Sequence, residues 1–242
     1  MQKAILAKKL ISNLDLTSLN LSDSKEDIIS LCEKAKTPFG NVCAVCVYPQ
    51  FIPLAKNLLK NTNIAVATVI NFPQGSSDII SIREQFINSI NYGADEIDAV
   101  FPYRDFLENN IDICRTFLET LTQNKADKKI KIILESGAFK HQELLMQACL
   151  LCLKYDIDFL KTSTGKTEVS ATPEAAKTII DSIKSASKNV GIKISGGIKT
   201  FEQSEQYYNI IQNAMGENWI TPQHFRIGAS SLLNNLIQEA KG

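Results

Sequence analysis

DFLKTSTGKTEVSATPEAAKTIIDSIKSASKNVGIKISGG, residues 158–197, contains a complete strand–helix–strand unit. Two apolar runs, Phe159–Thr162 and Gly191–Ile194, are expected to be strands that are buried on both faces. Between them, Thr172-Pro173-Glu174 has the features of a helix start, with a hydroxyl for the N-cap, a first-turn proline and an acidic residue. Isoleucines at positions 179, 180 and 183 then provide one apolar helix face. The stretch therefore predicts two parallel strands joined by a helix.

The same alternation of strand-like and helix-like segments extends over the whole chain. In residues 77–92 apolar side chains recur every three or four positions, and Gly93 follows where a helix would end. The expected strands are spaced at roughly thirty residues, the length of one βα unit. Such a series of units favours a closed barrel over an open doubly wound sheet, which stays the alternative. The other expected strands are Leu14–Leu19, Val42–Tyr48, Ile64–Ile70, Glu96–Phe101, Ile130–Leu134 and Phe225–Gly228.

Length and composition agree with this fold. The chain has 242 residues, and an α/β barrel typically needs ~250. We therefore expect residues 1–242 to form a single (β/α)8 TIM-barrel domain, with a short extra helix over Met1–Leu10. The chain has 26 basic and 26 acidic residues, so its zero net charge gives no sign of a nucleic-acid or membrane surface. No apolar run reaches the ~18 residues of a membrane span, and the N-terminus lacks the features of a signal peptide, so a cytoplasmic location is expected.

Four of the six cysteines form two C-x-x-C pairs, for which a zinc site is one interpretation. The spacing of Cys43 and Cys46, however, places them on opposite faces of a strand. Cys149 and Cys152 lie in a helix-like run that is typical of a core. Free buried thiols are therefore the expected state.

The only histidines are His141 and His224. A catalytic zinc site that polarises a carbonyl group commonly uses several histidine ligands, which this chain cannot supply, so no metal site is expected. His141 is expected to begin a surface helix. His224 precedes the last strand, at the end of the barrel away from the usual catalytic face.

Two lysines occupy strands that are expected to be neighbours. Lys161 ends its strand and would be partly desolvated in the barrel mouth, which lowers its pKa from ~10.4. A neutral amine can attack a carbonyl group and form a Schiff base. Lys193 lies between two isoleucines one βα unit later, and its positive charge would disfavour protonation of Lys161. The pair predicts a nucleophilic lysine, whereas either lysine alone could simply extend to solvent.

Carboxylates and glycine turns add to this prediction. Asp15 and Asp98 lie in expected strands between aliphatic residues, where a carboxylate is either functional or paired with a buried cation. Glycine turns follow the last two strands at Gly196-Gly197 and Gly228, the place where barrels often bind phosphate with backbone N–H groups and a helix N-terminus. A phosphorylated small molecule is therefore the expected substrate.

Six stretches of the sequence are distinctive: Leu14–Thr17, Lys36–Pro38, Ala44–Pro49, Phe101–Arg104, Asp158–Lys166 and Gly228–Ser231. Together they resemble bacterial deoxyribose-phosphate aldolases, in order from about residue 12 to residue 236. The resemblance implies a class I aldolase of deoxyribonucleoside catabolism that uses no metal or organic cofactor. Such an enzyme reversibly cleaves 2-deoxy-D-ribose 5-phosphate to acetaldehyde and D-glyceraldehyde 3-phosphate.

The resemblance also implies roles for individual residues. Lys161 would be the Schiff-base lysine, Lys193 the neighbour that lowers its pKa, and Asp98 the carboxylate that relays protons with an ordered water. The family's frequent dimers suggest a homodimer. The substrate would be bound by Asp15, Thr17, Leu19, Cys46, Thr164, Gly165, Lys166, Gly196, Gly197, Gly228, Ser230 and Ser231.

Two features depart from the family pattern. Lys199 follows the glycine pair where many members have arginine, and lysine is a point charge that cannot bind phosphate in a bidentate manner. Some members have a C-terminal tyrosine that assists proton transfer, whereas this sequence ends with Lys241-Gly242. Without that tyrosine, we expect either slower turnover or proton transfer by another group or by water. The alternative functions are a lysine-dependent barrel aldolase for a different phosphorylated sugar and a non-catalytic sugar-phosphate binding barrel.

Overall fold

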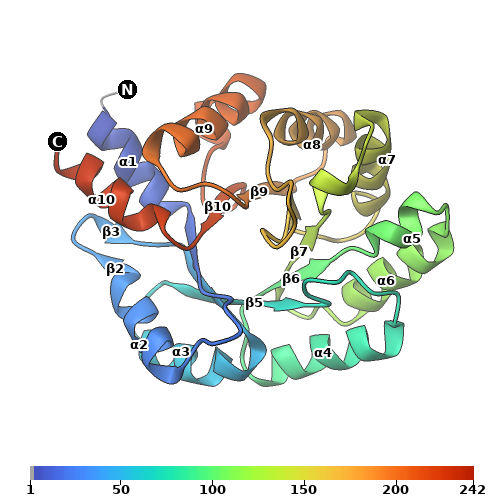
Figure 1. Cartoon of the computed structure of the whole chain (residues 1–242), viewed down its shortest axis with the longest axis horizontal. Helices are drawn as coiled ribbons and strands as arrows, with labels where there is room; N and C mark the ends of the chain where they lie inside the picture. The colour runs from blue at the N-terminus through green and yellow to red at the C-terminus, as the bar shows by residue number, and fades with distance from the viewer. Residues whose placement is uncertain (1–2) are drawn as a thin grey trace.

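The computed structural model describes residues 3–242, and its main feature is a closed barrel of eight parallel strands surrounded by helices (Figure 1). The ring closes because β1 pairs with both β4 and β10, so the open-sheet alternative is wrong. Each predicted strand is confirmed, with boundaries that differ by a few residues. The barrel strands are β1 Leu14–Thr17, β4 Ala44–Val47, β5 Ala65–Ile70, β6 Glu96–Val100, β7 Lys129–Ile133, β8 Phe159–Lys161, β9 Gly191–Ser195 and β10 Phe225–Ala229.

The helices surround the barrel on all sides (Figure 1). The expected N-terminal helix is confirmed as α1, although Met1 and Gln2 lie outside the described residues. A two-stranded hairpin, β2 Lys36–Thr37 and β3 Gly40–Asn41, precedes β4. The helices are α1 Lys3–Ser12, α2 Lys25–Lys34, α3 Ile52–Leu59, α4 Ile79–Asn91, α5 Tyr103–Leu107, α6 Ile111–Gln123, α7 Gln142–Cys152, α8 Pro173–Ala186, α9 Phe201–Met215 and α10 Leu232–Lys241.

Local sequence signals explain where several helices begin. The Thr172 hydroxyl accepts a hydrogen bond from the Ala175 N–H at 3.1 Å, which confirms it as the N-cap of α8. Helix α4 begins two residues later than predicted because Asp78 caps it by accepting from the Ser81 N–H. Gly93 follows α4 with φ +96°, a conformation that favours glycine. His141 occupies the N-cap position of α7, as predicted.

The barrel interior has two different sides. Next to β4 and β5 it is filled by a small apolar cluster of Leu19, Ala44, Cys46, Ala67 and Val69. From β6 around to β1, the buried interior residues are mainly charged. The outward side chains of the same strands join the helices in the main hydrophobic core. Strand alternation thus places an apolar layer outside the barrel and a charged group within one half of it.

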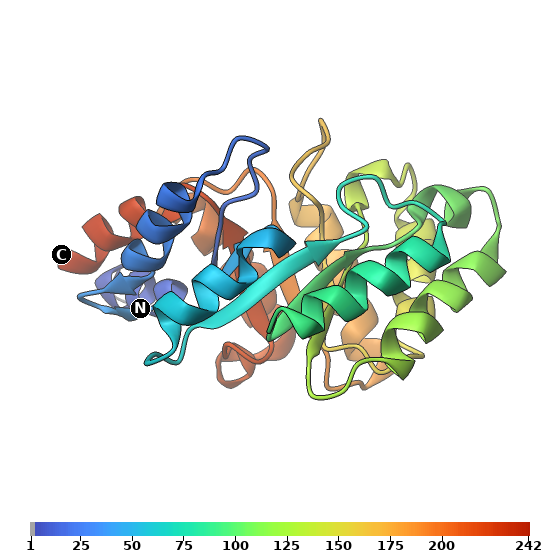
Figure 2. The same cartoon turned by 90° about the horizontal axis from the view of Figure 1, so that it is seen from below.

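The loops that follow the carboxyl ends of the strands meet at one face of the barrel. Figure 2 shows the loops after β1 and β8 rising on the same side of the molecule. Catalytic residues of barrels of this kind lie at this face. His224 lies just before β10, at the opposite end, and stacks on Trp219 with ring centroids 5.0 Å apart. Within residues 3–242, no helix has the length and apolar character needed to cross a membrane.

Candidate active site

Asp98, on β6, lies at the centre of a cluster of buried lysines. Its Oδ1 accepts a hydrogen bond from Lys131 Nζ at 2.8 Å, and its Oδ2 accepts from Lys161 Nζ and Lys193 Nζ, also at 2.8 Å each. The parallel register explains this geometry, because Lys161 lies beside Lys193 and Asp98 lies beside Lys131. The structure therefore brings together the three residues that the sequence analysis marked for catalysis.

A second set of charges lies below this cluster, toward the base of the barrel. Asp15 accepts from Lys193 Nζ at 2.5 Å and from Arg226 Nη1 at 2.6 Å. Glu96 pairs with Lys131 Nζ at 2.6 Å and with Arg226 Nη2 at 3.0 Å. The side chains of all these residues are at most 3% exposed. The charges form one connected network that includes Asp98, so each titration depends on the others.

Glu96, Lys131 and Arg226 were not among the site residues predicted from the sequence. A signal for Lys131 was present, because Ile130-Lys131-Ile132 repeats the pattern Ile192-Lys193-Ile194 that drew attention to Lys193. Arg226 likewise lies between Phe225 and Ile227 in an expected strand. A charged residue between large apolar residues in a buried strand needs a partner of opposite charge in the barrel interior.

The network gives its lysines different pKa values. Burial lowers the pKa of Lys161; the Asp98 carboxylate opposes this effect, and the positive charge of Lys193 adds to it. Burial also disfavours the charged form of Lys193, but Asp15 and Asp98 raise its pKa above the usual range. Although burial would raise the pKa of Asp98, Lys131, Lys161 and Lys193 hold it well below its usual range. Of the lysines in this network, Lys161 is therefore the one that loses its proton most easily.

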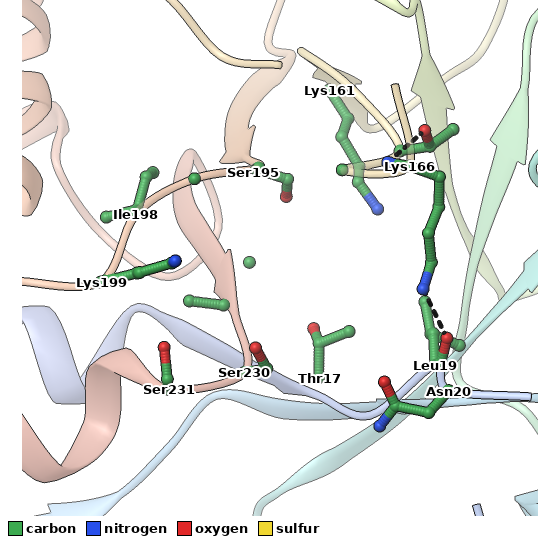
Figure 3. Close-up of a pocket in the computed structure, with 16 residues that line it drawn as sticks. Thr17, Leu19, Asn20, Lys161, Lys166, Ser195, Ile198, Lys199, Ser230 and Ser231 are labelled. Atoms are coloured by element: carbon green, nitrogen blue, oxygen red, sulfur yellow. Dashed lines mark hydrogen bonds between the residues drawn. The ribbon is translucent and has the colours of Figure 1, made fainter. Parts of the chain in front are cut away.

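A cavity of about 170 Å³ opens above the network, and Lys161 reaches its wall (Figure 3). Asp15, Cys46, Asp98 and Lys193 do not line it and are fully buried. All the other residues that were predicted to bind the substrate line the cavity. The wall is formed by Thr17, Leu19, Asn20, Lys161, Thr164, Gly165, Lys166, Ser195, Gly196, Gly197, Ile198, Lys199, Gly228, Ala229, Ser230 and Ser231.

Two loops are joined across the cavity mouth. Lys166, in the loop after β8, donates a hydrogen bond from Nζ to the Leu19 carbonyl oxygen at 2.8 Å, and Figure 3 shows its side chain along one side of the cavity. Lys199 lies on the opposite side, near Ser231 (Figure 3). Lys166, a predicted binding residue, is already engaged by the protein, whereas Lys199, which departs from the family pattern, extends toward the cavity.

Glu135, which the sequence analysis missed, holds the loop after β8. Its carboxylate accepts from the Thr164 hydroxyl at 2.5 Å, the Thr164 N–H at 3.3 Å and the Thr167 hydroxyl at 3.2 Å. The residue is fully buried and has φ 55° and ψ 57°, the left-handed region that non-glycine residues rarely adopt. Such strain persists where surrounding contacts fix the conformation, often near functional sites. No sequence pattern marks a left-handed glutamate.

The cysteines follow the expectation for buried thiols. Cys149 and Cys152 are in the core on α7, whereas Cys43 is half-buried and Cys46 is buried on β4. Burial raises the pKa of the Cys46 thiol, which favours its neutral form. All six are free, and residues 3–242 contain no group of three His, Cys, Asp or Glu side chains with the geometry of a metal site.

Comparison with known proteins yields one family and several similar folds. The sequence matches the model of the DeoC/LacD family of aldolases over residues 9–237. A provisionally named deoxyribose-phosphate aldolase from Coccidioides immitis has a TM-score of 0.84 and 26% identity, over 94% of this chain and 85% of that one. Another from Toxoplasma gondii ME49, in its apo form, has a TM-score of 0.90 and 22% identity, over 99% of this chain and 98% of that one.

A third structure, a deoxyribose phosphate aldolase from Aeropyrum pernix described as tetrameric, has a TM-score of 0.73 and 20% identity. The match covers 100% of this chain and 96% of that one. At 20% and 22% identity, the Aeropyrum and Toxoplasma structures demonstrate a shared fold and no more.

The contacts of Glu135 predict how its removal changes the loop after β8. In Glu135→Ala, the hydroxyl and the N–H of Thr164 lose their acceptor, and Thr167 keeps only the Val169 carbonyl oxygen within its own loop. Amide hydrogen exchange in residues 164–169 should therefore become faster by about 10-fold or more. Hydrogen exchange followed by mass spectrometry measures this rate. Glu168→Ala, at an exposed position in the same loop, is the matched control and should leave exchange unchanged. Equal exchange rates in Glu135→Ala and the native protein would contradict this role of Glu135.

Proposed function

The chain belongs to the DeoC/LacD family of aldolases, and from this premise we propose that its substrate is 2-deoxy-D-ribose 5-phosphate. The reaction is reversible cleavage to acetaldehyde and D-glyceraldehyde 3-phosphate, a step of deoxyribonucleoside catabolism. One observation carries the proposal: the Lys161 amine, whose pKa is lowered, lies at the wall of a polar cavity and 2.8 Å from the Asp98 carboxylate. A neutral amine beside a proton acceptor is what Schiff-base formation requires.

In the proposed mechanism, the neutral Nζ of Lys161 attacks C1 of the open-chain sugar and, after loss of water, forms a protonated imine. The C2–C3 bond then breaks. Its electron pair moves toward the iminium nitrogen, and the C3 hydroxyl loses its proton as D-glyceraldehyde 3-phosphate forms. The remaining enamine takes up a proton at C2, and water hydrolyses the imine to release acetaldehyde and the free amine. Atoms and protons balance over the cycle.

Asp98 is suited to move the proton in this cycle. Because three lysines keep its pKa well below the usual range, it is a carboxylate at neutral pH. It lies within hydrogen-bond distance of the Lys161 amine. We infer that it relays protons between the amine and an ordered water beside the C3 hydroxyl. Lys193 keeps its proton, and its positive charge favours the neutral form of Lys161.

The opposite side of the cavity has the features of an anion site. Gly196 and Gly197 adopt φ +98° and +83°, conformations that favour glycine and let backbone N–H groups approach a ligand. Ser230 and Ser231 precede the ten-residue helix α10, whose N-terminus carries partial positive charge. Lys199 adds a full charge at the same side. These groups support binding of the 5-phosphate by the loops after β9 and β10.

The apolar side of the barrel interior supports a small aldehyde donor. Leu19 reaches the cavity wall, and behind it lie Cys46, Ala67 and Val69. Small, closely packed apolar side chains accommodate the methyl group of acetaldehyde but leave little room for a larger ketone. This favours the deoxyribose phosphate reaction over a barrel aldolase for a different phosphorylated sugar.

Reduction with borohydride tests the nucleophile directly. When the protein is treated with acetaldehyde and borohydride, the imine should be reduced to a stable two-carbon adduct on Lys161. Peptide mass spectrometry locates the adduct, and Lys161→Met is the control that should not form it. An adduct on Lys193, or no adduct in the native protein, would show that the assignment is wrong.

Substitution of Ser231 tests the proposed binding of the 5-phosphate by the loops after β9 and β10. Ser231→Glu places a carboxylate where the phosphate would bind, and repulsion at an intermediate effective dielectric should cost roughly 2–3 kcal/mol. The affinity for 2-deoxyribose 5-phosphate should then fall by ~30–150-fold, as steady-state kinetics can measure. Unphosphorylated 2-deoxyribose has no anion to repel and should lose far less.

Ser231→Gln is the matched control for this substitution, because it adds similar volume without charge. If Ser231→Glu lowers activity equally on the two sugars, the residue supports the fold or the chemistry instead of phosphate binding.

A further inference from the structure

Ser195 presents an unused hydroxyl at the wall of the cavity. The residue is 5% exposed, and its Oγ is buried without a hydrogen-bond partner in the described chain. Figure 3 shows the side chain directed toward the interior of the cavity. Buried polar groups are nearly always hydrogen-bonded, so an exception on a pocket wall points to a ligand that completes the bond.

The backbone of Ser195 is already fully engaged. Its N–H donates to the Thr162 hydroxyl at 2.9 Å, and its carbonyl oxygen accepts from the hydroxyls of Thr162 at 3.0 Å and Ser163 at 2.6 Å. These bonds fix the end of β9 against the loop after β8. The side-chain hydroxyl is therefore the one polar group of Ser195 that the fold leaves unused.

The neighbouring strand makes room for this hydroxyl. Ser195 lies beside Gly228 in the register of β9 and β10. A Cβ atom at position 228 would lie 2.3 Å from Ser195 Oγ and 2.9 Å from Lys193 Cε. The glycine thus leaves open the space that the hydroxyl occupies, on the same interior face of β9 as Lys193.

Ser195 lies between the two ends of the cavity that the proposed function uses. It follows Lys193 by two residues on β9, and Lys161 lies beside Lys193 on β8. It immediately precedes Gly196 and Gly197, which support phosphate binding. A substrate joined to Lys161 at one end and held by its phosphate at the other must place its intervening hydroxyls near Ser195.

We propose that Ser195 determines specificity for the acceptor aldehyde, and that its Oγ hydrogen-bonds the hydroxyl next to the phosphate-bearing carbon. The ligand class is a phosphorylated 2-hydroxy aldehyde, and the inference rests on the proposed function. Ser195 directly precedes the glycine pair of the proposed phosphate side, and this connection assigns it the hydroxyl next to the phosphate-bearing carbon instead of the one formed in the reaction. An acceptor without it leaves the serine hydroxyl unpaired, and such a site discriminates against that analogue.

The test compares two acceptors in the condensation with acetaldehyde. One is D-glyceraldehyde 3-phosphate, and the other is 3-oxopropyl phosphate, which lacks only the 2-hydroxyl group. The native protein should have the higher kcat/KM on the hydroxylated acceptor. Ser195→Ala should lower that value by roughly 10-fold and leave kcat/KM on 3-oxopropyl phosphate nearly unchanged.

Ser136→Ala is the matched control. Ser136 also has a buried Oγ without a partner and is 5% exposed, but it lies in the loop after β7 and does not line the cavity. Its removal should leave the ratio of the two kcat/KM values unchanged.

Two results would overturn the inference while the proposed function stands: a native enzyme without preference for the hydroxylated acceptor, or an equal loss on both acceptors in Ser195→Ala. If the native protein condenses acetaldehyde with neither acceptor, the proposed function itself fails.

Discussion

The charges inside the barrel balance only if one basic side chain is neutral, and the chemistry of the site depends on this constraint. Asp15, Glu96 and Asp98 share the interior with four basic side chains. Lys131 contacts all three carboxylates, and Lys193 and Arg226 contact two each, whereas Lys161 contacts Asp98 alone. An uncompensated buried charge is costly, so the base with the fewest partners is the one expected to lose its proton. The lowered pKa of Lys161 and the raised pKa values of the other three agree with this.

The barrel makes this arrangement possible by its register and its closure. Parallel neighbours place Lys161 beside Lys193 and Asp98 beside Lys131, and closure brings β1 and β10 together so that Asp15 meets Arg226. The other half of the interior is apolar, and its Leu19 reaches the cavity wall opposite the charged network. At the mouth, Glu135 and Lys166 tie the loop after β8 to its neighbours.

Much of the fold could be predicted from the sequence, because parallel strands buried on both faces appear as short apolar runs at regular spacing. The neighbouring positions of Lys161 and Lys193 followed from the strand order alone. The contact between Asp15 and Arg226, 211 residues apart, could not be predicted before closure was known. The left-handed backbone of Glu135 depends on tertiary contacts, and the orphaned hydroxyl of Ser195 is a property of the whole pocket. Cys46, placed by resemblance at the substrate, is buried behind the cavity wall.

The central claim is that charge balance keeps Lys161 neutral, and the pH dependence of imine formation tests it most directly. The rate of borohydride-trapped imine formation should rise with pH through an apparent pKa below that of an ordinary lysine. In Lys193→Leu, Lys161 becomes the third cation opposite three carboxylates, so this pKa should rise by about 1 pH unit or more. In Glu96→Gln, which removes a carboxylate distant from Lys161, it should move in the opposite direction. An unchanged profile in Lys193→Leu, or one moved to lower pH, would contradict the account.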